Sequence, residues 1–180
     1  MIVKPNKKVR GFTLIETMVA TGVLLIAVVG PMSLLGNSLN NIYFVRDQML
    51  AVNLAQEGVE VVRQRRDTNF LSGVAWDGGF GTSDCAGGVT CVVDTNPTLA
   101  IMKCNGLCTE KVYKDPTDGF YHQYPSTPPL GVTPSLFTRK VNLVRVNGNE
   151  YTITVNVSWS TGRIPGSVTV TESIFRWAKA

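Results

Sequence analysis

The residue with the clearest chemical significance is a single acid, Glu16, within an otherwise uncharged apolar run at 12–35. Placing a carboxylate in the apolar part of a membrane helix costs roughly 2.5–3.5 kcal/mol at the bilayer centre and less near the ends. Two interpretations are open. Glu16 lies close enough to the lipid headgroups to be tolerated, or it meets a cationic partner inside an assembly.

A second group with chemical potential consists of four cysteines in a glycine- and proline-rich stretch: Cys85, Cys91, Cys104 and Cys108. In an oxidising compartment, four cysteines predict two disulfides with three connectivities. Local pairing, 85–91 with 104–108, is slightly favoured because Asn105-Gly106 supplies a tight turn. Nested pairing, 91–104 inside 85–108, is the alternative. Zinc is disfavoured because the C-x5-C and C-x3-C spacings do not fit usual ligand spacing.

The remaining candidates are two aspartates and the single histidine. The segment Asp115-Pro-Thr-Asp118-Gly119 is expected to form a turn, because Asp-Pro and Asp-Gly pairs favour turns. Calcium at Asp115 and Asp118 is the alternative, although the segment lacks a ligand series of the EF-hand kind. His122 lies among tyrosines and is expected in an aromatic cluster. One histidine in a loop offers no Ser-His-Asp or Cys-His arrangement, so we expect no catalytic residue, no cofactor and no enzymatic activity.

The distribution of charge separates the first eleven residues from the rest of the chain. The 180 residues include 17 Lys and Arg and 13 Asp and Glu, for a formal net charge of +4. Four basic residues and no acid precede Phe12, which leaves 13 basic and 13 acidic side chains in the remainder. These four are Lys4, Lys7, Lys8 and Arg10. The basic balance therefore does not indicate a nucleic-acid partner for the rest of the chain.

The apolar run is long enough to cross a membrane. As a helix rising ~1.5 Å per residue it would reach ~36 Å, against a hydrocarbon core of ~30 Å. The positive flank predicts a cytoplasmic N-terminus, with everything after Leu35 outside. A cleaved secretory signal is the alternative, but the run is too long, no small-residue cleavage site follows it, and Glu16 lies near its start. We therefore expect a single-pass anchor in contact with membrane lipid.

The residues around this anchor resemble a known processing motif. The segment Lys7-Lys8-Val9-Arg10-Gly11-Phe12-Thr13-Leu14-Ile15-Glu16 is similar to the N-terminus of type IV prepilins and type II secretion pseudopilins. The resemblance implies that prepilin peptidase cleaves between Gly11 and Phe12 and that Phe12 is then N-methylated. It also implies that Glu16, the fifth mature residue, meets the new amino group of a neighbouring subunit.

Physical arguments are consistent with these roles. Removing one partner of a buried ion pair leaves an uncompensated charge at a cost of ~3–5 kcal/mol, so such a pair would set the register between subunits. Gly11 lacks a Cβ atom and lets the backbone approach a protease closely. In the family, a proline near Pro31 accompanies loosening of the helix in the filament. A static kink at Gly30-Pro31 is the alternative.

The elements that position these residues follow an α+β order. Apolar residues recur every three or four positions past the membrane run, which predicts one helix continuing to about Arg66. These positions are Leu35, Leu39, Ile42, Val45, Met49, Val52, Ala55, Val59 and Val62. Residues 67–134 predict a loop-rich connector with one or two short strands.

The C-terminal part is rich in β-branched and aromatic residues. Strands are expected over 136–146, 151–160 and 167–177, joined by turns at 147–149 and 161–166, with one apolar face laid on the helix. The expected divisions are a cleaved leader (1–11), a transmembrane assembly half (12–35), an amphipathic half (36–66), the connector (67–134) and a β-sheet head (135–180). This is also the order of the pilin fold.

The resemblance implies a minor pilin or pseudopilin that assembles into a type IV pilus or a type II secretion-like filament. Segment 51–67 resembles the helix of I/V-type minor subunits, which argues against a major subunit. Expected partners are other pilin or pseudopilin subunits, prepilin peptidase, an inner-membrane assembly platform and membrane lipid. The chain would lie in the cell membrane before assembly and in a periplasmic or extracellular filament afterwards.

Three other functions remain open from the sequence. The head could act as an adhesin, with the connector as its recognition surface. A DNA-uptake (competence) role would require an exposed basic patch, for which Arg139, Lys140 and Arg145 are the candidates. A bitopic membrane protein unrelated to filaments is the generic alternative.

Overall fold

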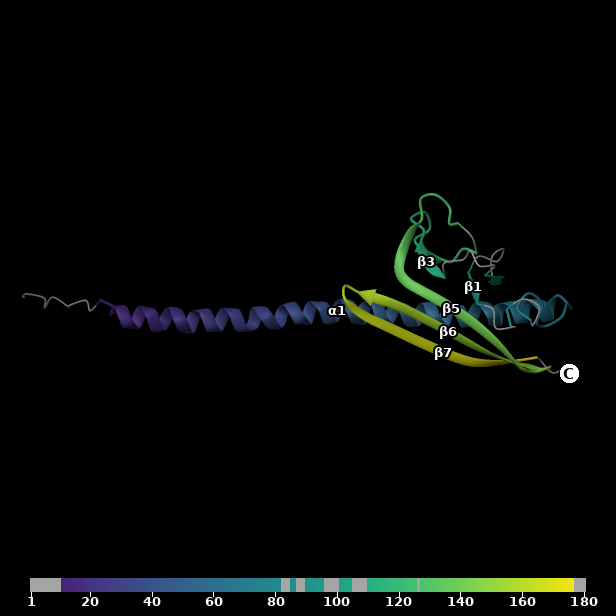
Figure 1. Ribbon diagram of the computed structural model, residues 1–180, viewed down its shortest axis with the longest axis horizontal. Helices are drawn as coiled ribbons and strands as arrows, with labels where there is room; N and C mark the ends of the chain where they lie inside the picture. Colours follow the sequence, from purple (N-terminus) through teal and green to yellow (C-terminus); the bar gives the residue numbers. More distant parts are fainter. Residues whose placement is uncertain are drawn as a thin grey trace, which may run out of the picture. The chain divides into compact units, whose positions relative to one another are not determined.

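The computed structural model describes residues 11–81, 85–86, 90–95, 101–104, 110–125 and 127–176, apart from the side chains of Ser33 and Asn37 (Figure 1). The chain divides into two compact units, 1–43 and 44–180. One helix, α1 (Leu14–Leu71), contributes residues to both units. Its first part belongs to the N-terminal unit, and its second part belongs to the unit that carries the β-sheet. From here on, the head means this whole unit (44–180), which is larger than the sheet region predicted at 135–180.

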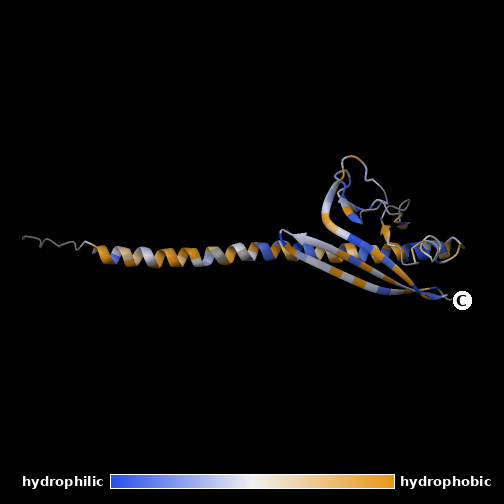
Figure 2. Cartoon of the chain, viewed as in Figure 1, coloured by the Kyte–Doolittle hydropathy of each residue, from blue (hydrophilic) through white to orange (hydrophobic). Residues whose placement is uncertain are grey.

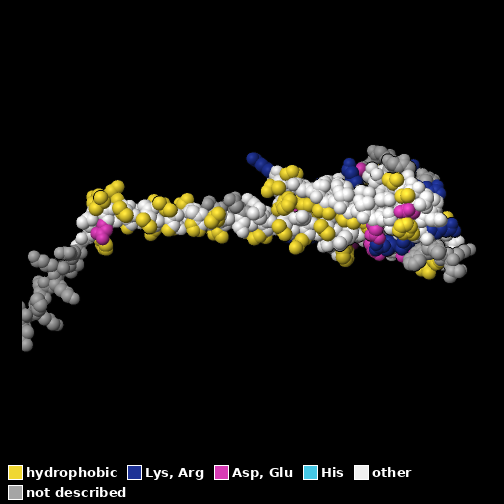
Figure 3. All heavy atoms as spheres, turned by 90° about the horizontal axis from the view of Figure 1, so that it is seen from below, with side chains coloured by type: hydrophobic (Ala, Val, Ile, Leu, Met, Phe, Trp, Pro, Cys, Tyr) yellow, Lys and Arg dark blue, Asp and Glu magenta, His cyan; other side chains and the backbone are white. Residues whose placement is uncertain are grey.

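The N-terminal unit is an apolar helix. α1 begins at Leu14 and stays helical through Pro31. Its described side chains are exposed, and apolar ones occur along its length (Figures 2 and 3). Because these apolar residues recur at intervals of one to four positions from Phe12 to Tyr43, they lie on every side of the helix. The helix contains a window long and apolar enough to cross a membrane. A helix that is apolar on every side needs lipid or other helices as its surroundings.

Within the head, α1 continues five residues beyond the predicted end at Arg66 and stops at Leu71. The stop is a Schellman motif, in which Val74 N donates to Asn69 O at 3.1 Å and Gly73 N donates to Phe70 O at 3.2 Å. Gly73 has a φ of 67°, a left-handed conformation that glycine adopts without a Cβ penalty. Gly73, and not the last position of the apolar pattern, therefore marks the end of the helix.

In the described residues, the head carries one antiparallel sheet of seven strands, whereas three long strands and one or two short connector strands were predicted. The long strands are β5 (Thr133–Asn147), β6 (Glu150–Thr161) and β7 (Ile164–Phe175). The connector adds four short strands: β1 (Cys91–Val93), β2 (Ile101–Lys103), β3 (Lys111–Lys114) and β4 (Tyr121–His122). β5 pairs with β1, β3 and β6, so the connector extends the sheet and is not a separate loop region.

The turns of the C-terminal meander differ from the prediction at one end. β5 and β6 meet at the predicted turn, but β7 begins at Ile164, directly after the Gly162–Arg163 turn. Pro165 and Gly166, predicted as turn residues, therefore lie inside a strand. Proline is tolerated there because β7 pairs only with β6 and is an edge strand. Gly166 is needed because a Cβ atom would lie 2.3 Å from Cζ2 of Trp159.

The core lies between α1 and the inner face of the sheet. Alternate residues of β6 point inward, and the facing helix contributes small side chains. The buried helix positions include Ala51, Leu54, Ala55, Val59 and Val62. Gly58 lets the helix approach the sheet closely, since a Cβ atom there would lie 3.0 Å from Cγ1 of Val155. The expected α+β architecture, with a long helix on an antiparallel sheet, is confirmed.

The apolar stripe predicted along the helix is only partly the core face. Val45 and Met49 are 47% and 65% exposed, whereas Asp47, which the pattern left out, is buried. Asp47 accepts a hydrogen bond from the Thr161 hydroxyl at 2.8 Å and pairs with Arg46 at 3.0 Å. The spacing of apolar residues alone did not identify which face meets the sheet, because a helix with apolar residues on two faces satisfies the same periodicity.

Candidate processing and assembly site

Thr13 and Glu16 form a reciprocal capping arrangement at the start of α1. Glu16 N donates to the Thr13 hydroxyl at 3.4 Å, and Thr13 N donates to Oε2 of Glu16 at 3.5 Å. Thr13 immediately precedes the helix, and Glu16 is its third residue. This is the geometry of a capping box, in which two unpaired N–H groups of the helix end are satisfied. The Thr-x-x-Glu spacing was visible in the sequence, and the prediction missed it.

The carboxylate of Glu16 therefore has an intramolecular role. It lies in the first turn of α1, where the helix dipole favours negative charge. The hydrogen bond from Thr13 N to this carboxylate lowers the free-energy cost of placing Glu16 in an apolar environment. The same bond partly satisfies the backbone N–H of Thr13. The capping box lies on the C-terminal side of the predicted cleavage position, so cleavage after Gly11 would leave both members in the mature chain.

Gly11 and Phe12 precede the helix and are exposed. No neighbouring atom would lie within 4 Å of a Cβ atom at Gly11, and Phe12 is 82% exposed. The peptide bond between them is thus unobstructed by the rest of the described chain. The basic residues from Lys4 to Arg10 lie outside the described residues.

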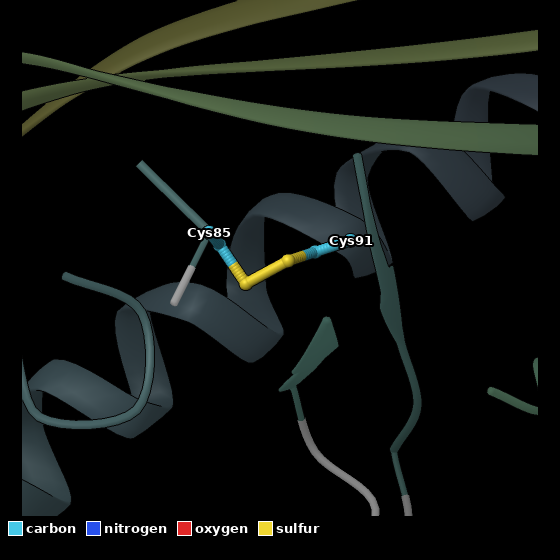
Figure 4. The surroundings of a disulfide bond; sticks show 2 residues. All are labelled: Cys85 and Cys91. Carbon is cyan, nitrogen blue, oxygen red and sulfur yellow. A yellow bond between two sulfur atoms is a disulfide. The ribbon is translucent and has the colours of Figure 1, made fainter. Parts of the chain in front are cut away.

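Cys85 and Cys91 form a disulfide with a Cα–Cα distance of 5.8 Å (Figure 4). The nested pairing of Cys91 with Cys104 is therefore wrong, and the first half of the local pairing is present. Cys104 is also disulfide-bonded, and Cys108 lies outside the described residues. Both Cys85 and Cys91 are buried in the head core, and Cys91 begins β1. The disulfide holds the connector onto the sheet.

Asp115 and Asp118 are turn residues. Asp115 Oδ1 accepts bonds from the Thr117 hydroxyl at 2.6 Å and the Thr117 amide at 2.8 Å, and these bonds lower the pKa of Asp115. Asp118 accepts from the Phe120 amide and from Nε2 of His122. Both carboxylates thus have N–H or O–H donors. Within the ranges described above, no group of three or more His, Cys, Asp or Glu side chains has a geometry that could hold a metal ion.

His122 lies between two carboxylates rather than simply among aromatic rings. Its Nδ1 is 3.1 Å from Asp94 Oδ1, its Nε2 is 3.0 Å from Asp118 Oδ2, and its ring centroid is 6.3 Å from that of Tyr124. Burial lowers the pKa of His122, but hydrogen bonds to Asp94 and then Asp118 outweigh it and raise the pKa overall. Asp94 is distant in sequence, so only the fold brings this pair together.

Arg139 is fully buried, which removes it from the basic patch considered for DNA. Its guanidinium donates to Glu57 Oε1 at 2.7 Å, to Gln123 Oε1 at 2.8 Å and to the carbonyls of Leu54 and Val93 at 3.1 and 2.6 Å. It thereby joins α1, β1 and β5.

The other two candidates for a basic patch, Lys140 and Arg145, do not lie together with Arg139 on one surface. Lys140 pairs with Glu110 at 3.0 Å, and Arg145 lies near the far end of β5. The proposed trio does not form.

An apolar N-terminal helix, a second helical half packed on an antiparallel sheet and a disulfide in the connector define an α+β, pilin-like subunit. Residues 6–30 match the model of the prokaryotic N-terminal methylation motif. The chain therefore carries the signature of type IV pilins and pseudopilins, a class of structural subunits and not an enzyme family. No curated protein and no solved structure matches the chain.

The methylation motif and the apolar helix together indicate where the chain is anchored and what it associates with. They fit anchoring in a membrane before assembly, since the motif overlaps the start of an apolar helix of sufficient length. The motif also implies association with other pilin subunits and with prepilin peptidase.

Proposed function

We propose that the protein is a minor pilin or pseudopilin, cleaved by prepilin peptidase between Gly11 and Phe12, methylated at Phe12 and incorporated into a type IV pilus or a type II secretion-like filament. The observation that carries this proposal is the methylation motif at 6–30, which overlaps the start of a membrane-length helix, with Gly11 and Phe12 exposed directly before that helix. In this role the protein is structural and not catalytic. The inner-membrane assembly platform is its further expected partner.

The helix of the N-terminal unit supports filament incorporation. Its described apolar side chains are exposed, so they are suited to burial in lipid or against the helices of neighbouring subunits. Extraction from the bilayer into a filament core would exchange one apolar environment for another. The hydrophobic effect then changes little, and polar groups decide the position of each subunit.

Glu16 is the polar group that would set the position of each subunit in the filament. Before assembly its carboxylate is held by Thr13. In a filament, the α-amine created at Phe12 of a neighbouring subunit would offer a full positive charge instead of an amide N–H. Charge-assisted hydrogen bonds are roughly twice as strong as neutral ones, so exchange of partners would favour the assembled state.

The head supports a minor role more than a DNA-binding one. Segment 51–67, which resembles the helix of I/V-type minor subunits, supplies the buried helix face against the sheet. Arg139 is in the core and Lys140 is paired with Glu110, so neither candidate residue is an exposed, unpaired cation for a phosphate backbone.

The processing step is tested by mass spectrometry of the protein extracted from membranes and from sheared filaments. The expected mature chain begins at a methylated Phe12. A Gly11→Ala variant should accumulate with its leader intact, with Gly22→Ala as the matched control, since neither glycine has neighbours within 4 Å of a Cβ position. A filament fraction that still begins at Met1 would refute the processing claim.

The assembly step is tested by separating the charge of Glu16 from its capping function. Glu16→Gln keeps an oxygen that can accept from Thr13 N–H but removes the charge, whereas Thr13→Val removes the hydroxyl and keeps the charge. We expect Glu16→Gln to insert in the membrane normally and to be lost from filaments, and Thr13→Val to be incorporated. Normal incorporation of Glu16→Gln would show that the charge does not set the register.

A further inference from the structure

A cavity of about 550 Å³ opens at the end of the head where α1 stops. Its walls are formed by Phe70 at the end of the helix, the following loop at 73–77, Gly148 in the β5–β6 turn, and two arginines. Arg145 belongs to β5, and Arg176 directly follows β7. All of these belong to the head. The volume lies within the range of about 300–1,000 Å³ that is usual for ligand sites.

The two arginines are not neutralised within the cavity. Arg145 is engaged by a carbonyl, since its Nε donates to Asn147 O at 3.2 Å, and neither it nor Arg176 forms an ion pair in the part of the chain that the structure describes. Among the described residues that line the cavity there is one acid, Asp77, whose Oδ2 accepts from the hydroxyl of Tyr151 at 2.9 Å. The cavity therefore carries an excess of positive charge.

The remaining wall is apolar. Phe70 and Val74 are 47% and 58% exposed, and Trp76 is buried against Tyr151 and Phe80 with centroid distances of 5.4 and 6.1 Å. Exposed apolar side chains beside two cations are suited to a ligand that presents a carboxylate and an apolar group together. Arginine is the side chain that best matches a planar carboxylate, because its N–H groups donate in parallel.

We propose that this cavity binds an acidic peptide segment of a partner protein, in which an apolar side chain lies next to the carboxylate. The carboxylate would accept hydrogen bonds from Arg145 and Arg176, and the apolar side chain would contact Phe70 and Val74. A nucleic acid is disfavoured as the occupant because its backbone needs an extended row of cations, and the cavity offers two. This inference concerns the head alone and does not rest on the proposed processing or filament assembly.

The test uses the full-length chain in a zwitterionic detergent, with the indole N–H resonance of Trp76 as the reporter. A Trp76→Phe variant assigns that resonance. The probes are N-acetyl-phenylalanine and its uncharged amide, which differ only in the carboxylate. We expect a saturable shift with the carboxylate probe, and binding of the amide that is weaker by about tenfold, as the loss of charge-assisted hydrogen bonds predicts.

Arg145→Gln and Arg176→Gln should each weaken binding of the carboxylate probe by about five- to tenfold, while Arg163→Gln, in the exposed β6–β7 turn, should leave it unchanged. Thermal melting of each variant shows whether it remains folded, and both cavity arginines are exposed enough to be replaced without loss of core. The proposal would be overturned if the acid and the amide bound equally well, or if neither arginine variant changed the affinity for the carboxylate probe. Tighter binding of an oligothymidylate than of that probe would also overturn it.

Discussion

Arg139 shows how a residue type can indicate the wrong environment. Arg139 was a candidate for the exposed basic patch that a DNA-uptake role would require, yet it lies on the inner face of β5 among carbonyl and carboxylate acceptors. Lys140, the next residue, points to the opposite face because side chains alternate along a strand. Two adjacent cations therefore have unrelated roles, and the difference makes them a matched pair for experiment.

Replacing Arg139 by Ala should destabilise the head by about 3–5 kcal/mol, because Gln123 and two carbonyls lose their donor and Glu57 loses its partner. Lys140→Ala should cost less than about 1 kcal/mol, since Lys140 is 57% exposed and forms a surface ion pair. Denaturant unfolding of the full-length chain in detergent, followed by near-ultraviolet circular dichroism, measures both. Similar losses for the two variants would contradict the assigned role of Arg139.

His122 should make the stability of the head depend on pH. Because its pKa is raised in the folded state, the native protein holds the proton more tightly than the unfolded chain does. The resulting stabilisation is fully present below the unfolded pKa of about 6.5 and is lost as pH rises through the folded value. The melting temperature of the wild type should therefore exceed that of His122→Gln most at pH 5–6, and the difference should shrink by pH 8–9. A difference that is constant with pH would argue against an ionised His122.

At the scale of elements, the start of β7 depends on the contact between Gly166 and the Trp159 ring, which the sequence of β7 does not predict. Pro165 and Gly166 read as turn residues, but the indole of Trp159 on β6 lies over Gly166 and the two residues occupy opposite positions in the strand pair. Trp159 in turn packs against Phe44 of α1 and Phe137 of β5, with centroid distances of 5.7 and 6.3 Å. The start of the edge strand is thus part of the aromatic packing between helix and sheet.

Gly166→Ala should destabilise the head by about 1–3 kcal/mol, because the new methyl group would require Trp159 to move out of a packed position. Ser167→Ala, on the next residue of the same strand and on its exposed face, should change stability by less than about 0.5 kcal/mol. Thermal unfolding of the two variants under the same conditions provides the comparison. An unchanged melting temperature for Gly166→Ala would show that Trp159 has another stable position.

At the scale of the whole molecule, the division into two units has a clear energetic basis. The buried apolar side chains begin at Ala51, and none of them belongs to residues 11–43. The N-terminal unit contributes exposed apolar surface, and the head contributes the core. Membrane or filament contacts and the folding of the head are therefore separable properties of one chain.

A fragment of residues 44–180 should accordingly be soluble and should unfold cooperatively under oxidising conditions. It retains every buried core residue as well as Phe44, which packs against Trp159. Adding a reductant should lower its melting temperature, because the Cys85–Cys91 bond holds the connector onto the sheet. Circular dichroism and calorimetry test both expectations. A fragment that binds hydrophobic dyes and melts without a cooperative transition would show that the head needs residues 1–43.

The sequence by itself determined the N-terminal anchor, the methylation motif and the α+β order. Those features depend on local properties: the length of an apolar run, the position of a glycine before Phe12, and the alternation of residues along β6. The helix start at Thr13 and Glu16 and its stop at Gly73 were equally local and could have been predicted from capping rules.

Only the tertiary structure decided which groups meet across the fold. Asp94 and His122, Glu57 and Arg139, and Trp159 and Gly166 come from different elements, and their contacts follow from strand register and helix orientation. The same holds for the four short strands of the connector, whose sequences are too brief to specify a partner. Hydrophobic periodicity fixes the type of an element, whereas the pairing of polar groups is set by the distances that close packing leaves between elements.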